Sequence, residues 1–109
     1  MGNIRVMLCC GAGMSSGFMA QRARKAAKKY GLDIAIDARS ESQVNQYIGS
    51  IDLLMLGPHY SSQLPHYEKI CEGQRCAVCV IPQDIYGALD GEALLRIIME
   101  KLQIKEKQV

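Results

Sequence analysis

The sequence lacks the features that mark membrane-spanning or exported chains. Its apolar runs stay far below the roughly 18 residues that a membrane-spanning helix needs, and even residues 6–14 include Gly11 and Gly13. No charged start followed by an apolar stretch and a cleavage site precedes the first apolar segment. Position 6 is Val6, where a myristoylation signal carries Ser or Thr. We therefore expect a cytosolic chain without direct membrane insertion.

An excess of charge of one sign is also missing. Lysine and arginine number 13 against 11 acidic residues, which gives a formal net charge of +2. Five cations fall between Arg22 and Lys29 without an intervening acid, but no aromatic residues alternate with them for stacking on bases. The pattern predicts a solvated helix face that can steer a protein partner. It argues against nucleic-acid binding.

The chain does contain enough apolar material for one core. Hydrophobic residues make up 49% and charged residues 22% of the 109 residues, a balance unlike that of a disordered tail. This length fits one domain covering residues 1–109, and no repeat or linker divides it. The five cysteines are an odd number in a chain without a leader, which indicates reduced thiols and no disulfide framework.

Segments that suit strands alternate with helical patterns along the chain. The predicted strands are residues 4–9, 32–38, 51–56 and 75–81, and the predicted helices are residues 17–30, 40–48, about 61–71 and 91–103. This alternation, with right-handed crossovers, predicts an α/β fold: a small doubly wound, four-stranded parallel sheet with helices on both faces. Ligands of such folds bind beyond the carboxyl ends of the strands, so the loop at residues 10–17 is the expected site.

Helix faces and helix ends can also be predicted. The residues expected to form the packed stripe of the first helix are Phe18, Ala20, Ala23, Ala26 and Ala27. The candidate helix caps are Ser40, then Ser61 or Ser62, and Asp90.

The loop after the first strand has the composition of an anion-binding site. Glycines there permit close backbone approach, serines supply hydroxyl donors, and the first-turn amides of the next helix point into the same volume. The candidate phosphate-binding residues are Gly11, Ala12, Gly13, Met14, Ser15, Ser16 and Gly17. Cys10 precedes them, and the helix dipole that favours phosphate also favours a thiolate. Cys10 is therefore the candidate nucleophile, whereas Cys9 is expected to point into the core.

The spacing separates three phosphate-binding patterns. A nucleoside-triphosphate loop requires a lysine, and none precedes Lys25. A dinucleotide loop requires glycine at position 16, which is Ser16, although Asp37 stands where a ribose-binding acid would lie. A cysteine phosphatase loop requires an arginine at that same position and an Asp-Pro general acid, and the sequence has neither. The loop of this chain, which lacks both the arginine and the general acid, is suited to hold a phosphoryl group until an acceptor arrives.

Two separated segments carry a family resemblance. Residues 8–16 read LCCGAGMSS and residues 52–58 read DLLMLGP. They resemble the IIB component of the lactose/cellobiose/chitobiose family of the bacterial phosphoenolpyruvate-dependent sugar phosphotransferase system, over nearly the whole chain. The resemblance implies a fold similar to low-molecular-weight tyrosine phosphatase. It also implies that Cys10 accepts a phosphoryl group from phosphohistidine of a IIA component.

The same resemblance implies a second transfer, from Cys10 to a sugar. The phosphoryl group passes to a sugar bound by the membrane permease IIC, and a β-linked disaccharide such as cellobiose or lactose is the expected sugar. No cofactor or metal is expected. The alternatives that the residues leave open are a cysteine-dependent low-molecular-weight phosphatase or arsenate-reductase-like enzyme, and a nucleotide-binding regulatory module.

Histidine, tyrosine and the remaining cysteines complete the candidate residues. His59, Tyr60 and Tyr86 follow predicted strands at their carboxyl ends and are the candidate interface residues, with His59 able to face the Cys10 loop. Cys76 and Cys79 have C-x-x-C spacing, but within a strand such residues point to opposite faces, so both are expected in the core. Cys71, with no evident partner, is expected to be structural.

Overall fold

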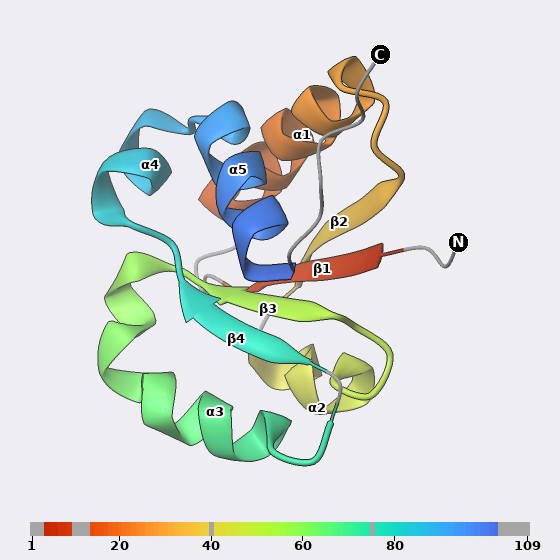
Figure 1. Cartoon of the computed structure of the whole chain (residues 1–109). Helices are drawn as coiled ribbons and strands as arrows, with labels where there is room; N and C mark the ends of the chain where they lie inside the picture. Colours follow the sequence, from red (N-terminus) through yellow and green to blue (C-terminus); the bar gives the residue numbers. More distant parts are fainter. Residues whose placement is uncertain (1–3, 10–13, 40, 75, 103–109) are drawn as a thin grey trace.

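A computed structural model describes residues 4–9, 14–39, 41–74 and 76–102 of the chain (Figure 1). Strands alternate with helices, as the sequence predicts. The elements in chain order are β1 (Ile4–Cys9), α1 (Met14–Lys29), β2 (Ile34–Arg39), η1 (Glu41–Gln43), α2 (Val44–Tyr47), β3 (Leu53–Leu56), η2 (Pro58–Gln63), α3 (Leu64–Cys71), β4 (Ala77–Val80), α4 (Gln83–Ala88) and α5 (Gly91–Leu102).

The strands form one parallel sheet in the order β2-β1-β3-β4. β1 lies between β2 and β3, and Cys9 at its end is in register with Leu56 at the end of β3. The chain runs from β1 to β2 on one side and then crosses to β3 on the other, so strand order reverses beside β1. Figure 1 shows α1, α4 and α5 on one face and α2 and α3 on the other. The predicted doubly wound fold is confirmed.

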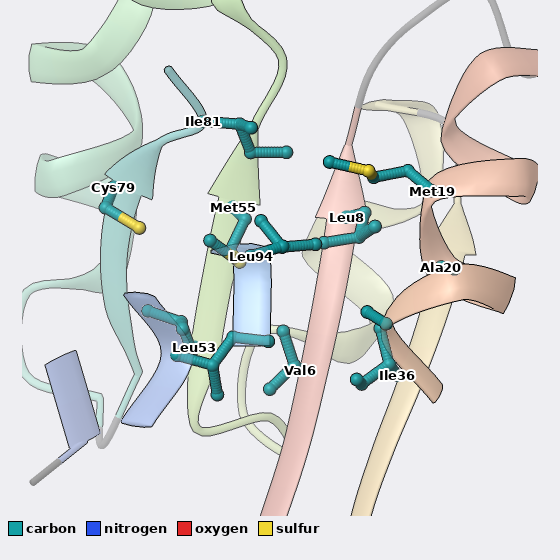
Figure 2. Packing of buried hydrophobic residues seen from close by; sticks show 12 residues of the cluster. Val6, Leu8, Met19, Ala20, Ile36, Leu53, Met55, Cys79, Ile81 and Leu94 are labelled. Atoms are coloured by element: carbon teal, nitrogen blue, oxygen red, sulfur yellow. The ribbon is translucent and has the colours of Figure 1, made fainter. Parts of the chain in front are cut away.

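Consecutive residues of the two central strands are buried on opposite faces of the sheet. The side chains facing α1 and α5 are Val6, Leu8, Leu53 and Met55 (Figure 2). Those facing α2 and α3 are Met7, Cys9, Leu54 and Leu56. All of them are at most 2% exposed. A continuous apolar run is typical of a parallel strand covered on both faces, which is why residues 4–9 could be predicted with their correct bounds.

The first helix begins earlier than predicted, at Met14 instead of Gly17. Its alanine stripe is buried as expected, but the prediction that Phe18 belongs to the stripe is wrong, because Phe18 is 55% exposed. At about 100° per residue Phe18 lies nearly opposite the stripe, whereas Met19, fully buried, falls within it. Figure 2 shows Met19 directed toward Leu8 of β1.

Several helix ends differ from the prediction. Ser61 and Ser62 cap no helix, because the 3₁₀ helix η2 begins at Pro58 directly after β3 and includes both serines. α3 then begins at Leu64 without a side-chain cap. The predicted cap Ser40 lies outside the described residues, and the segment after it divides into η1 and α2. α4 is absent from the prediction because its six residues are too few for a helical period to be recognised.

α1 and α5 meet at a point where only glycine fits. A Cβ on Gly91 would lie 2.5 Å from the carbonyl oxygen of Arg22 and 2.8 Å from the backbone nitrogen of Ala23. Both atoms belong to the backbone of α1, so they cannot move aside without displacing the helix. The predicted cap is present here, since the Ala93 N–H donates to Asp90 Oδ1 at 3.1 Å.

Gly91→Ala should therefore lower the free energy of unfolding by about 1–3 kcal/mol, as overpacking in a tight core contact does. Urea denaturation followed by circular dichroism measures the change. Gly87→Ala is the matched control, because it lies in α4 and a Cβ there would meet no atom within 4 Å. We expect that control to be neutral or stabilising, since alanine favours helix over glycine. Equal stability of the two variants would contradict the close contact.

Candidate functional site

The candidate site lies at the edge of the sheet where β1, β3 and β4 end. The Gly57 N–H donates to the carbonyl oxygen of Cys9 at 3.0 Å, and the Ile81 N–H donates to that of Leu56 at 2.8 Å. The chain segments that leave these three strands therefore start side by side. Residue 10 comes directly after β1 in the sequence, next to the reversal of strand order. This is the position at which ligands bind in doubly wound folds.

The predicted anion-binding loop is divided between described and undescribed residues. Cys10, Gly11, Ala12 and Gly13 lie outside the described residues. Met14, Ser15, Ser16 and Gly17 form the first turn of α1. This first turn contains no acidic residue, and the last turn contains Lys28 and Lys29. A helix of 16 residues with an uncompensated positive end is suited to stabilise an anion beside its first turn.

Gly17 lies at the exposed surface of this turn. A Cβ at Gly17 would meet no atom within 4 Å, so its own packing does not require glycine. A ligand or a partner can therefore approach the first turn of α1 on the side of Gly17.

The three candidate interface residues lie close together. His59 and Tyr60 belong to η2, and Tyr86 belongs to α4, an element that the sequence pattern did not indicate. The ring centroids of His59 and Tyr60 are 4.9 Å apart, and those of His59 and Tyr86 are 6.2 Å apart in a T-shaped arrangement with an interplanar angle of 62°. His59 is exposed and Tyr86 is half-buried, whereas Tyr60 is only 8% exposed and packs in the core. His59 and Tyr86 thus present an aromatic surface at this edge of the sheet.

Cys79 lies in β4 and Cys76 directly before it, and the two side chains are buried on opposite faces of the sheet, as predicted. Cys76 packs with α2 and α3, whereas Cys79 packs on the opposite face with α1 and α5. Cys9 is fully buried, as expected. The prediction that Cys71 has no partner is wrong, because its sulfur lies 3.3 Å from that of Cys76. α3 ends at Cys71, and the turn at Gly73 (φ 82°) returns the chain to β4, a reversal that spacing alone does not indicate.

Burial makes these thiols poor nucleophiles. It raises the pKa of Cys79 to about 11 and also raises the pKa of Cys71. The pKa of Cys76 is raised further, by burial first and then by the hydrogen bond with Cys71. The thiolate is the reactive form, and all three groups are protonated near neutral pH. None of them is therefore equipped for phosphoryl transfer.

The described residues show neither a metal-binding cluster nor a membrane span. No group of three or more histidine, cysteine, aspartate or glutamate side chains among them is arranged to hold a metal ion. Within the same part of the chain, no helix has both the length and the apolar character to cross a membrane.

Comparison with solved structures defines the fold. The lactose-specific IIB component domain of the phosphoenolpyruvate:carbohydrate phosphotransferase system (PTS) from Streptococcus pneumoniae matches with a TM-score of 0.83 at 16% identity, over 91% of this chain and 97% of that one. The cellobiose-specific phosphotransferase IIB component from Borrelia burgdorferi matches with a TM-score of 0.76 at 26% identity, over 98% of both chains.

A phosphatase-type structure is also similar. A mutant of YwlE from Bacillus subtilis, a low-molecular-weight tyrosine phosphatase, has a TM-score of 0.53 at 14% identity, over 92% of this chain and 99% of that one. The predicted similarity to the low-molecular-weight tyrosine phosphatase fold is confirmed, and at this identity it concerns the fold alone.

Sequence comparison defines the family. The PTS system galactose-specific EIIB component of Lactococcus lactis subsp. cremoris (strain MG1363) is 28% identical over 95 residues, which cover 83% of this chain and 88% of that protein. The cellobiose-specific EIIB component of Lactococcus lactis subsp. lactis (strain IL1403) has the same identity and coverage. Residues 5–96 match the family model described as PTS system, Lactose/Cellobiose specific IIB subunit. PTS IIB components are phosphotransferases. The chain belongs to this lactose/cellobiose-specific IIB family.

Proposed function

We propose that the chain is a phosphocarrier whose Cys10 accepts a phosphoryl group and passes it to a sugar. The match of residues 5–96 to the IIB family carries this proposal. Its donor is phosphohistidine of a IIA component, and its acceptor is a sugar bound by the permease IIC. The chain acts as a single IIB domain on the cytosolic side of the membrane. The galactose- and cellobiose-specific names of its relatives favour a β-linked disaccharide or a related sugar.

The surroundings of residue 10 support the choice of nucleophile. Cys10 stands between a buried central strand and a helix whose first turn carries Ser15 and Ser16 and no acid. The positive end of α1 favours the thiolate form and the negative charge of a phosphoryl group. The buried thiols of Cys71, Cys76 and Cys79 lack such an environment, because burial raises their pKa values.

The reaction consists of two balanced displacements at phosphorus. The Cys10 thiolate attacks the phosphohistidine, an S–P bond forms, the P–N bond breaks, and the imidazole leaves. A sugar hydroxyl then attacks the phosphocysteine, an O–P bond forms, and the thiolate leaves while the hydroxyl proton passes to a base of the acceptor site. Backbone amides of residues 11–17 and the hydroxyls of Ser15 and Ser16 neutralise the charge on the phosphoryl oxygens.

The carrier role is favoured over hydrolysis by the residue at position 16. It is Ser16, so the loop lacks the arginine of a cysteine phosphatase, and Pro58, Pro65 and Pro82 are not preceded by aspartate. The similarity to YwlE concerns the fold only. A nucleotide-binding module is disfavoured because position 16 is Ser16, where a dinucleotide loop requires glycine.

The aromatic pair His59 and Tyr86 is our proposed contact surface for the partners of the transfer. Both residues follow strands at the edge of the sheet where Cys10 stands in the sequence. Their rings form a T-shaped pair with centroids 6.2 Å apart, and His59 is exposed. Aromatic side chains of this kind are enriched in protein interfaces.

The proposal predicts where phosphate is attached. After incubation with the phosphorylated general phosphotransferase proteins and a IIA component, peptide mapping should find the label on Cys10. Cys10→Ser should lower sugar phosphorylation by on the order of 10³-fold or more, as loss of a nucleophile does. Cys9→Ala is the control, since Cys9 is fully buried in the core and should be dispensable for labelling.

Each alternative function predicts a different experimental result. A phosphatase would hydrolyse an aryl phosphate without a donor protein, and that hydrolysis would depend on Cys10. A nucleotide sensor would bind nucleotide equally well in the Cys10→Ser variant. Label on any other residue, or labelling that survives Cys10→Ser, would overturn the assignment.

The thiols should also differ in their rate of alkylation. With iodoacetamide at about pH 8 we expect Cys10 to react first, because only a thiolate reacts and the end of α1 favours it. Cys71, Cys76 and Cys79 should react only as the protein unfolds, since their pKa values are raised and Cys79 reaches about 11. Mass spectrometry of the quenched samples measures the order, and in denaturant all cysteines should react alike. Fast native modification of Cys76 or Cys79 would contradict the observed burial.

A further inference from the structure

A surface groove runs between α1 and the segment that joins α4 to α5. It has a volume of about 1150 Å³. Phe18, Arg22, Lys25 and Lys29 of α1 line one wall, and Leu89, Asp90, Glu92 and Arg96 line the other. We call it the α1–α5 groove. Figure 1 shows these helices on the face of the sheet opposite α2 and α3.

The wall formed by α1 has a regular spacing. Phe18, Arg22, Lys25 and Lys29 occur at positions i, i+4, i+7 and i+11 of one helix. Residues at these intervals share one helix face, and the row spans about 16 Å at the helical rise. An apolar ring therefore stands at one end of a row of cations.

The acidic residues of the groove already accept hydrogen bonds from other residues of the chain. Glu92 accepts a hydrogen bond from Lys29 Nζ at 3.1 Å and another from the Tyr30 hydroxyl at 3.1 Å. Asp90 accepts the Ala93 N–H as the cap of α5. Among the described residues, no ion pair involves Arg22, Lys25 or Arg96. The groove thus presents Arg22 and Lys25 without an ion-pair partner among the described residues, whereas Arg96 lies close enough to Glu92 to help lower the pKa of that carboxyl.

Phe18 gives the groove an apolar contact point. It is 55% exposed and is the only large hydrophobic side chain that is exposed in the described part of the chain. Its neighbours on α1, Met19 and Ala20, are buried in the core. An exposed aromatic ring beside a concave, charged surface is a typical anchor of a protein interface.

We propose that the α1–α5 groove binds an acidic amphipathic segment of a partner protein. Carboxylates of that segment pair with Arg22, Lys25 and Arg96, while an apolar side chain packs on Phe18. This is the helix-in-groove mode, in which anchors of the bound segment repeat at helical intervals. The proposal is independent of the phosphoryl transfer assigned to Cys10.

Other anionic ligands fit the groove less well. A nucleic acid presents an unbroken row of phosphates and no aliphatic side chain to pack on Phe18, and one exposed phenylalanine offers little base stacking. A flat membrane surface would contact the rims but could not fill the concave floor at Ala26 and Gly91. A peptide can place carboxylates and apolar groups at separate points, as this mixed surface requires.

A synthetic peptide of this chemistry tests the proposal. The probe is an amphipathic helix of about 16 residues with leucine at one position and glutamate 4, 7 and 11 residues after it. A second peptide carries glutamine in place of glutamate. NMR titration of the ¹⁵N-labelled chain should show shifts at residues of the groove with the glutamate peptide. Binding should weaken about tenfold in the Arg22→Gln/Lys25→Gln variant and on raising the salt from about 50 to about 500 mM.

Control variants distinguish binding in the groove from non-specific electrostatic attraction. Lys28→Gln removes a cation of α1 that does not line the groove and should change the Kd less than about twofold. Phe18→Ser should weaken binding of the glutamate peptide, and that binding should stay as sensitive to salt as it is in the unchanged chain. Equal binding of the glutamine peptide, or no shifts in the groove, would overturn the proposal. So would groove-dependent binding of a DNA duplex or of phosphatidylglycerol vesicles without peptide binding.

Discussion

The structure depends on a central strand, β1, that is enclosed on every side. β1 is hydrogen-bonded in parallel to β2 and β3, and its residues from Val6 to Cys9 are buried under helices on both faces. Such a strand has little freedom to shift, because a slip of one residue would exchange the two buried faces. The hydrogen bond from the Gly57 N–H to the Cys9 carbonyl then fixes where β1 ends relative to β3. The end of β1 at Cys9 is thus set by the core itself.

The other boundary of the loop is fixed by the packing of α1. Arg24 Nη1 donates to the carbonyl oxygen of Ile36 at 2.6 Å, which ties α1 to β2. Gly91 brings α5 against the backbone of the same helix, and alanines at the contact permit this close approach. The middle of α1, from Arg22 to Arg24, is consequently held by contacts with two elements. A loop between Cys9 and Met14 therefore connects two ends that the rest of the fold keeps in place.

The same contacts explain what the sequence could and could not predict. Residues 4–9 and the last helix were predictable, because a continuous apolar run and the spacing of Leu94, Leu95 and Ile98 report burial locally. The place where strand order reverses was predictable as well, since alternating strands and helices imply it. Contacts that depend on tertiary packing were not. The exposure of Phe18 depends on how α1 sits on the sheet.

The approach of Cys71 to Cys76 belongs to the same class, because it depends on a turn whose course no periodicity describes. The failure to predict α4 also affected the description of the site. Tyr86 was expected in a loop, and its contact with His59 arises because Pro82 starts a short helix there. Of the candidate anion loop, the structure bears only on the helical end, since Cys10 to Gly13 lie outside the described residues.

Under the proposed function, the choice between transfer and hydrolysis of a phosphocysteine lies in a few side chains and not in the fold. The similarity to YwlE covers 92% of the chain, so the fold is shared. Under the proposed function, Ser16 in place of an arginine removes a strong stabiliser of the transition state for attack by water. In that proposal backbone amides of the loop bind the phosphoryl group, and the partner supplies the acid and the clamp that the sequence lacks. Transfer then depends on which protein docks at this edge of the sheet, and exposed His59 lies there to be contacted.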